Sequence, residues 1–225
     1  NYLAERLEGR GGLVHPCLAY ALLQDEGAAC SCEGDVITAA TLALVSRFLG
    51  EPCFMTNALP MSLAPRAAER LGAPVHRYDP SRTLLLGHCS YLGPVPLSVA
   101  TRVAFRRKYD RAHRSGVVVD AELPAGPLTL VRLSPVLDAL QVVPCRLREV
   151  ARFRSPHCRA VAVVEVRDSR EVAERLYSYH VAVALGDRRR EPRMLSRALG
   201  GQVRGAEVKR EGLSPGATAQ SLPRE

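Results

Sequence analysis

From about residue 83 onward, the sequence is dominated by short runs of aliphatic and β-branched residues separated by Gly, Pro and Ser. Runs of this kind with few helical segments between them predict an antiparallel sheet or barrel. We therefore expect a barrel-like, β-rich C-terminal domain over residues 81–212, which closes with a helix over 170–177 and the strand of His180, followed by a helix over 193–199 and a last strand over 202–208. The segment 99–113 between two of the runs is basic and fits a helix or a loop. The runs are 83–87, 117–123, 128–133, 140–150 and 159–166.

Before residue 80 the pattern is different, because helical and strand-like segments alternate. A helix over 16–24, a short strand over 28–32, a helix over 36–49 and a strand over 53–56 are expected. The second helix is apolar nearly all round, which predicts burial on more than one face. Such alternation favours parallel strands joined by crossover helices, so residues 1–80 are interpreted as the C-terminal part of an α/β domain. Residues 213–225 are expected to form a disordered tail.

Two carboxylates, Glu33 and Asp35, stand between the expected strand and the apolar helix. Open α/β sheets bind ligands at the carboxyl ends of their strands, so Glu33 is placed for metal or acid–base chemistry. The alternative is structural. Asp35 then caps the helix, and Glu33 is a solvated loop residue.

Composition limits the class of protein. The chain of 225 residues has no apolar run long enough for a membrane span and no signal peptide, so a soluble, cytoplasmic protein is expected. Its seven scattered cysteines fit reduced thiols better than a disulfide framework. The net charge of +8 comes almost entirely from arginine, and no aromatic RNA-binding signature accompanies it, so nucleic-acid binding is disfavoured. The densest basic clusters are Arg102, Arg106, Arg107, Lys108, Arg111 and Arg114, and Arg188, Arg189, Arg190 and Arg193.

Two distant segments resemble L-fucose isomerase and its relatives. Residues 32–54 read CEGDVITAATLALVSRFLGEPCF, which is similar to the part of the family that carries its metal-binding Glu. Residues 178–187 read SYHVAVALGD, which is similar to the strand that carries the family's metal-binding His. With weaker matches at 86–89, 126–130 and 156–159, the resemblance extends over residues 13–205. It implies that the chain is the C-terminal part of a longer protein or the product of a shortened gene.

The resemblance also implies a site. Glu33 would be a metal ligand and proton carrier, and His180 a second ligand. Asn57 falls where the family has an acidic ligand and catalytic residue, so it would be a weak, neutral ligand that carries no proton. His88 and Asp35 are the candidate substrate-binding residues, with Asp35 alternatively supplying the missing carboxylate and His88 alternatively structural. The implied cofactor is Mn²⁺ or another divalent cation, the implied substrate a sugar, and the implied assembly a homo-oligomer.

Three functions follow. The first is a metal-dependent aldose–ketose isomerase that acts on a pentose or deoxyhexose through an enediol, with activity reduced by Asn57. The second is an inactive descendant that keeps the fold and binds sugar. The third is a basic module that binds polyanions.

Overall fold

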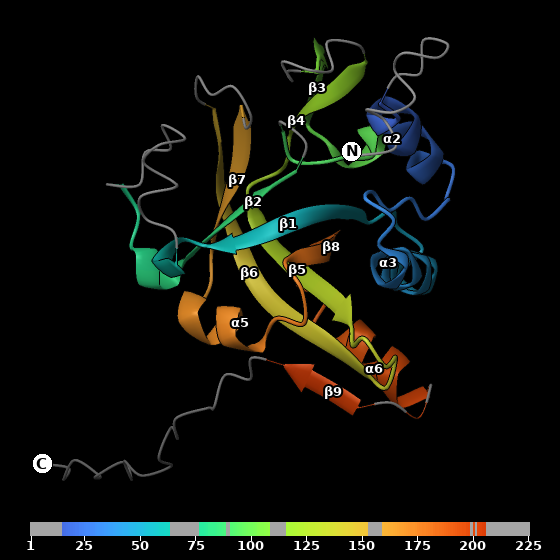
Figure 1. Ribbon diagram of the computed structural model, residues 1–225, viewed down its shortest axis with the longest axis vertical. Coiled ribbons are helices and arrows are strands. Elements are labelled where there is room, and N and C mark those ends of the chain that lie inside the picture. The colour runs from blue at the N-terminus through green and yellow to red at the C-terminus, as the bar shows by residue number, and fades with distance from the viewer. Residues whose placement is uncertain are drawn as a thin grey trace, which may run out of the picture.

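A closed barrel of six antiparallel strands forms the centre of the computed structural model, which describes residues 15–63, 77–88, 91–108, 116–152, 159–198, 200 and 202–205 (Figure 1). The strands follow the order β5-β8-β1-β2-β7-β6, and β6 pairs back onto β5 to close the barrel. Every neighbouring pair in this ring is antiparallel. The expected barrel-like β-rich part is therefore present. Its strands are β1 (Phe54–Pro60), β2 (Thr83–Gly87), β5 (Gly126–Leu133), β6 (Ala139–Arg152), β7 (Ala160–Glu165) and β8 (His180–Leu185).

The expected parallel α/β arrangement before residue 80 is not found in residues 15–63 and 77–80, which are the part of this segment that the structure describes. Residues 28–32 form no strand, and β1 pairs antiparallel with both β8 and β2. Helix α3 (Val36–Leu49) connects to β1 without crossing between parallel strands. The physical reason is that β1 completes its hydrogen bonding with strands from much later in the chain.

Two smaller β elements lie beside the barrel. Strand β3 (Arg102–Arg107) pairs with β4 (Val117–Glu122) in a separate two-stranded ribbon, so the basic segment expected as a helix or loop is a strand over these residues. Strand β9 (Gln202–Gly205) pairs with β6 in parallel. The expected tail at 213–225 lies outside the described residues.

Alternate side chains of the barrel strands belong to two different cores. Phe54, Leu86 and Val181 share one apolar cluster with residues of all six strands, as expected for the barrel interior. Met55 and Ala182, which are next to them in sequence on the opposite face, pack against Leu42 of α3 instead. His180 alternates with Val181, so it starts β8 on the face that α3 covers.

Helix α3 begins and ends as its sequence predicts. Asp35 Oδ1 accepts a hydrogen bond from the Thr38 amide at 2.8 Å, and Gly50 takes the left-handed conformation at the C-terminus with φ 67°. The expectation of burial on more than one face was wrong, because the buried residues form a single stripe and Val36 and Phe48 are exposed. That stripe is Thr38, Thr41, Leu42 and Val45.

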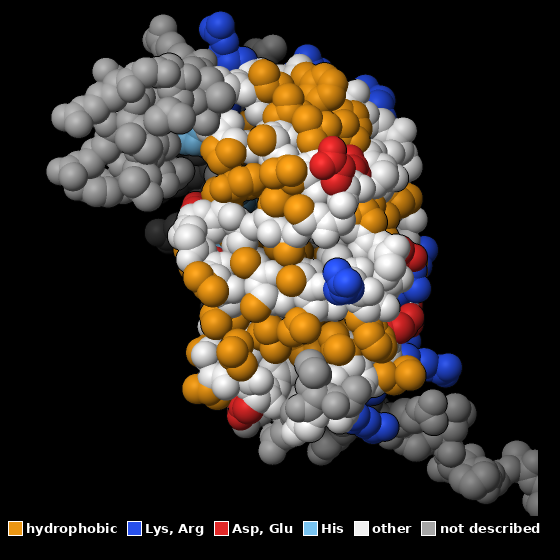
Figure 2. Space-filling view, turned by 90° about the vertical axis from the view of Figure 1, so that its right-hand side faces the viewer, with side chains coloured by type: hydrophobic (Ala, Val, Ile, Leu, Met, Phe, Trp, Pro, Cys, Tyr) orange, Lys and Arg blue, Asp and Glu red, His pale blue; other side chains and the backbone are white. Residues whose placement is uncertain are grey.

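The remaining helices pack around the barrel and its ribbon: α2 (Cys17–Asp25) against β4, α5 (Ser169–Arg175) against β1 and α6 (Arg190–Ala198) against β6. Figure 2 looks onto the side that carries α2 and α3, where hydrophobic side chains gather in bands; the exposed ones on these helices include Leu22, Leu23 and Phe48. Among the described helices, none has the length and apolar character needed to span a membrane.

Candidate metal centre

Glu33 lies in a tight turn directly before α3. Its φ is 59° and that of Gly34 is 70°, so two consecutive residues take the left-handed conformation. Glycine adopts this conformation freely, but a residue with a side chain pays about 1 to 3 kcal/mol for it. The turn is held on both sides, because the Cys32 amide contacts Met55 Sδ at 3.3 Å and Ser31 Oγ donates to the Asp35 carbonyl at 2.9 Å. Within this turn, backbone strain therefore falls on Glu33, whose carboxylate reaches the centre described below.

Two histidines approach Glu33 from neighbouring parts of the barrel. His180 is the first residue of β8, and His88 directly follows β2. Strand β1 lies between β8 and β2, and Asn57 is its residue in register with both His180 and Gly87. The barrel thus brings together side chains from the turn before α3, the end of β2 and the start of β8.

Glu33, His88 and His180 each offer one ligand atom, and these atoms all lie within 4.8 Å of one another. Glu33 Oε2 is 3.4 Å from His180 Nε2, and Glu33 Oε1 is 3.7 Å from His88 Nε2. Around a tetrahedral ion with bonds of about 2.1 Å, two ligand atoms stand about 3.4 Å apart. The separations therefore match the space that a divalent ion requires.

The histidine nitrogens provide a second test of this fit. His180 Nε2 and both ring nitrogens of His88 are buried and form no hydrogen bond with any part of the chain that the structure describes. Buried polar atoms normally form hydrogen bonds, so three buried histidine nitrogens without a partner require an explanation. A metal ion bound between them and the Glu33 carboxylate would satisfy both Nε2 atoms. The residues present fit such an ion.

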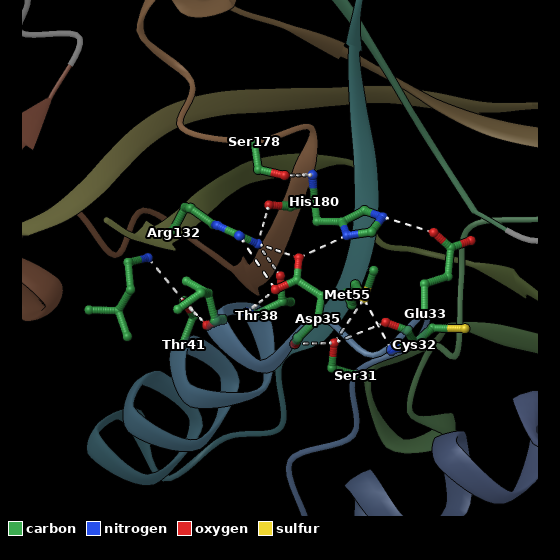
Figure 3. A network of polar contacts seen from close by, with 12 residues as sticks. Ser31, Cys32, Glu33, Asp35, Thr38, Thr41, Met55, Arg132, Ser178 and His180 are labelled. Carbon is green, nitrogen blue, oxygen red and sulfur yellow. Dashed lines mark hydrogen bonds and ion pairs between the residues drawn. The ribbon is translucent and has the colours of Figure 1, made fainter. Parts of the chain in front are cut away.

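Asp35 holds His180 in place rather than facing a separate pocket (Figure 3). Its Oδ2 lies 2.9 Å from His180 Nδ1. Because a carboxylate only accepts hydrogen bonds, this contact places the proton on Nδ1 and leaves the Nε2 lone pair toward Glu33 and His88. A metal-binding histidine is commonly oriented by a carboxylate in this way.

Arg132 fixes Asp35 in turn. Its Nη1 lies 2.8 Å from Asp35 Oδ2 and donates to the His180 carbonyl at 3.1 Å, and it also contacts Thr38 Oγ1. Burial alone raises the pKa of Asp35, but hydrogen bonds from Arg132, Thr38 and His180 hold the pKa well below its usual range. Asp35 is therefore a carboxylate whenever the protein is folded near neutral pH.

His88 is uncharged near neutral pH. Its pKa is lowered to about 4: burial is the largest cause, the nearby Glu33 charge acts in the opposite direction, and His180 and Lys108 contribute to the lowering. Only a neutral imidazole has a lone pair for a metal. The electrostatic surroundings of His88 thus favour the form that binds cations.

Asn57 adds no charge to this centre. Its Oδ1 is buried and has no hydrogen-bond partner among the described residues, and its backbone faces His180 across the β1–β8 ladder. The five residues selected from the sequence thus lie in one region, where Glu33, His88 and His180 form the cluster and Asp35 supports it.

Sequence reasoning missed Arg132 entirely and took His88 for a substrate-binding or structural residue. The available signal for Arg132 was its position as a single charge within the apolar run 128–133. A buried charge in a strand requires a partner, which here is Asp35. His88 carried no comparable signal, because only the return of β8 beside β1 brings His180 near it.

No protein-family model matches the chain, and no curated protein matches it either.

Proposed function

We propose that this chain binds a divalent metal at Glu33, His88 and His180 and belongs to the aldose–ketose isomerase type, acting on a pentose or deoxyhexose through an enediol. The observation that supports it most is the convergence of these three side chains, with 3.4 and 3.7 Å between Glu33 and the two Nε2 atoms. The resemblance to L-fucose isomerase supplies the reaction, and with it a sugar substrate and a homo-oligomeric assembly.

The roles of the residues follow from their chemistry. His88 and His180 would hold the ion through Nε2, and Glu33 through one carboxylate oxygen. When bound, the ion would act as a Lewis acid on the two adjacent sugar oxygens. Glu33 is one-third exposed, whereas the side chains of both histidines are at most 7 % exposed, so the sugar would approach from the Glu33 side. The second oxygen of Glu33 would carry the proton between the adjacent carbons.

The donor set bears on the identity of the metal. The resemblance implies Mn²⁺, and two imidazoles with one carboxylate also suit Fe²⁺ and Zn²⁺. With Glu33 as the single carboxylate among the three ligands, the centre keeps one net positive charge when a divalent ion is bound. We therefore propose weak metal binding and slow turnover.

A second candidate function is a descendant that binds sugar without converting it. The neutral Asn57 favours this candidate, because it leaves one proton carrier where the mechanism of the resembled family uses two. The two candidates differ in turnover and share the metal centre.

Calorimetric titration of the metal-free protein with Mn²⁺, Fe²⁺ and Zn²⁺ tests the centre. Binding of one ion per chain is expected, and Glu33→Gln and His180→Ala should each weaken it by about tenfold or more. A matched control is Glu51→Gln, which removes a carboxylate remote from the cluster. Equal binding by the wild type and both site variants would refute the metal centre.

Ketose formation from L-fucose and L-arabinose in the presence of the bound metal distinguishes the two candidates. Slow conversion that is lost in Glu33→Gln supports the isomerase. Metal and sugar binding without any conversion supports the inactive descendant.

A further inference from the structure

A hollow of about 440 Å³ lies at the opposite end of strands β2 and β8 from the metal centre. Strand β2 starts beside Arg82 at this hollow and ends before His88, whereas β8 starts at His180 and is followed by Asp187 and Arg189 at the hollow. Five strand residues span about 16 Å. The hollow and the metal centre are therefore separate places on the barrel.

The hollow has an excess of positive charge. Five arginines line it, against two carboxylates, which leaves three positive charges. The arginines are Arg82, Arg146, Arg148, Arg167 and Arg189, and the carboxylates are Glu165 and Asp187.

Three of the guanidinium groups share the two carboxylates. Arg82 lies 2.6 Å from Glu165, and Arg148 contacts the same carboxylate. Arg189 holds Asp187 through two contacts, of 2.7 and 2.6 Å.

Arg146 and Arg167 have no carboxylate partner within the described part of the chain. Arg146 faces Glu165 across the β6–β7 ladder, and Arg167 comes two residues after Glu165, so both stand at the same rim. Their guanidinium groups repel the other cations of the rim and remain available to an anion.

The floor of the hollow is apolar, since Pro127, Leu128, Pro144, Cys145 and Val166 line it between the charged side chains. A volume of 440 Å³ falls in the range of small-molecule sites. No aromatic residue is among the described lining residues, whereas single-stranded nucleic acids are usually held by stacking on aromatic rings. The hollow therefore suits a compact anion with an organic part better than a polynucleotide.

We propose that this hollow binds a small phosphorylated molecule, with its phosphate on Arg146 and Arg167. A phosphate monoester carries nearly two negative charges at neutral pH, which offsets most of the excess, and guanidinium groups bind phosphate oxygens in pairs. The organic part of the molecule would lie over Pro127, Pro144 and Val166. This inference does not depend on the metal centre.

The test is a titration of the whole chain with phenyl phosphate and, separately, with inorganic phosphate. Binding is measured by calorimetry and by ³¹P NMR. Saturable binding of one phenyl phosphate per chain, tighter than that of inorganic phosphate, is expected. The double variant Arg146→Gln/Arg167→Gln should weaken it by about tenfold or more, because charged hydrogen bonds are lost. Both residues are exposed, and a thermal melt checks that the variant remains folded.

A matched control keeps the net charge of the double variant. Arg107→Gln/Arg170→Gln removes two exposed arginines outside the hollow and should change the affinity by less than about twofold. Equal losses in the two double variants would show attraction by net charge alone and overturn the proposal. So would the absence of saturation by phenyl phosphate, including the case in which a single-stranded oligonucleotide binds instead.

Discussion

Asp35 Oδ2 lies 2.9 Å from His180 Nδ1, and this contact leaves Nε2 as the nitrogen of His180 that faces the proposed metal centre. The two residues are 145 positions apart in the sequence, yet Asp35 also caps α3 through its other oxygen. One aspartate therefore ties the start of a helix to the orientation of a histidine on a barrel strand.

Asp35→Asn should reverse the tautomer of His180. An asparagine oxygen in the Oδ1 position still caps α3 and accepts from Arg132 Nη2, and the NH₂ group in the Oδ2 position then faces His180 Nδ1, with the contact to Arg132 Nη1 lost. Nδ1 must then accept, so the proton moves to Nε2 and the lone pair facing Glu33 is lost. Nitrogen-15 NMR of the histidine rings in the metal-free protein measures the tautomer directly.

Metal affinity should fall with this change, by about 10- to 100-fold. Ser31→Ala, in the same turn, is the control and should leave the His180 tautomer unchanged. An unaltered tautomer in Asp35→Asn would contradict the role assigned to Asp35.

The lowered pKa of Asp35 predicts a specific dependence of stability on pH. Because its folded-state pKa lies below the ordinary value of 3.8, ionised Asp35 stabilises the fold above that value. This contribution decreases progressively as the pH falls below 3.8, because the unfolded chain then binds a proton at Asp35 and the folded protein does not. Urea unfolding from pH 7 to pH 2.5 should show a smaller difference between the wild type and Asp35→Asn at the acidic end. A difference in unfolding free energy that stays constant with pH would show that ionised Asp35 does not stabilise the fold.

Asn57→Asp should exchange stability for metal affinity. Without metal, the new carboxylate places negative charge where Asn57 Oδ1 is buried without a described partner, which should cost about 1 to 3 kcal/mol of unfolding free energy. With metal, the added charge should strengthen binding and recover that loss. Thermal melts with and without Mn²⁺ measure both effects, and Asn57→Ala, which keeps Glu33, His88 and His180, should gain no more from the metal than the wild type. An Asn57→Asp variant whose melting ignores Mn²⁺ would place residue 57 outside the metal centre.

Glu33→Gly should stabilise the metal-free protein while removing a metal ligand. Glycine tolerates φ 59° without steric cost, so a gain of about 1 kcal/mol in unfolding free energy is expected. Glu33→Ala removes the same carboxylate but keeps the strained backbone, so it should bind metal equally poorly without that gain. Comparing the two by urea unfolding isolates the backbone term, and equal stabilities would show that the turn stores no strain.

The β-strands were largely predictable because their composition and the turn residues between them are local properties. The direction of β1 could not be predicted, because it is set by pairing with β2 and β8, which lie far from β1 in the sequence. The local alternation of helices and strands suggested parallel pairing, and no nearby residue contradicted it.

Predictability at the candidate centre followed the same division. Asp35 could be recognised as a helix cap from its neighbours alone, and the structure shows that cap. The contact between Asp35 and His180 could not be predicted in this way, because it forms only when the barrel closes. Glu33 and His180 were selected from the sequence through resemblance, and their approach to 3.4 Å is a property of the fold.

The position of β1 between β8 and β2 also has a consequence for biosynthesis. A ribosome releases Glu33, Asn57 and His88 long before it releases His180, so a nascent chain that lacks β8 has an open barrel and an incomplete centre. Pairing between segments so far apart is slow, since a long loop must close first. A product that ends before β8 would therefore lack His180, one of the three ligands of the proposed metal centre, and binding of a divalent ion by the complete chain would show that β8 has joined the barrel.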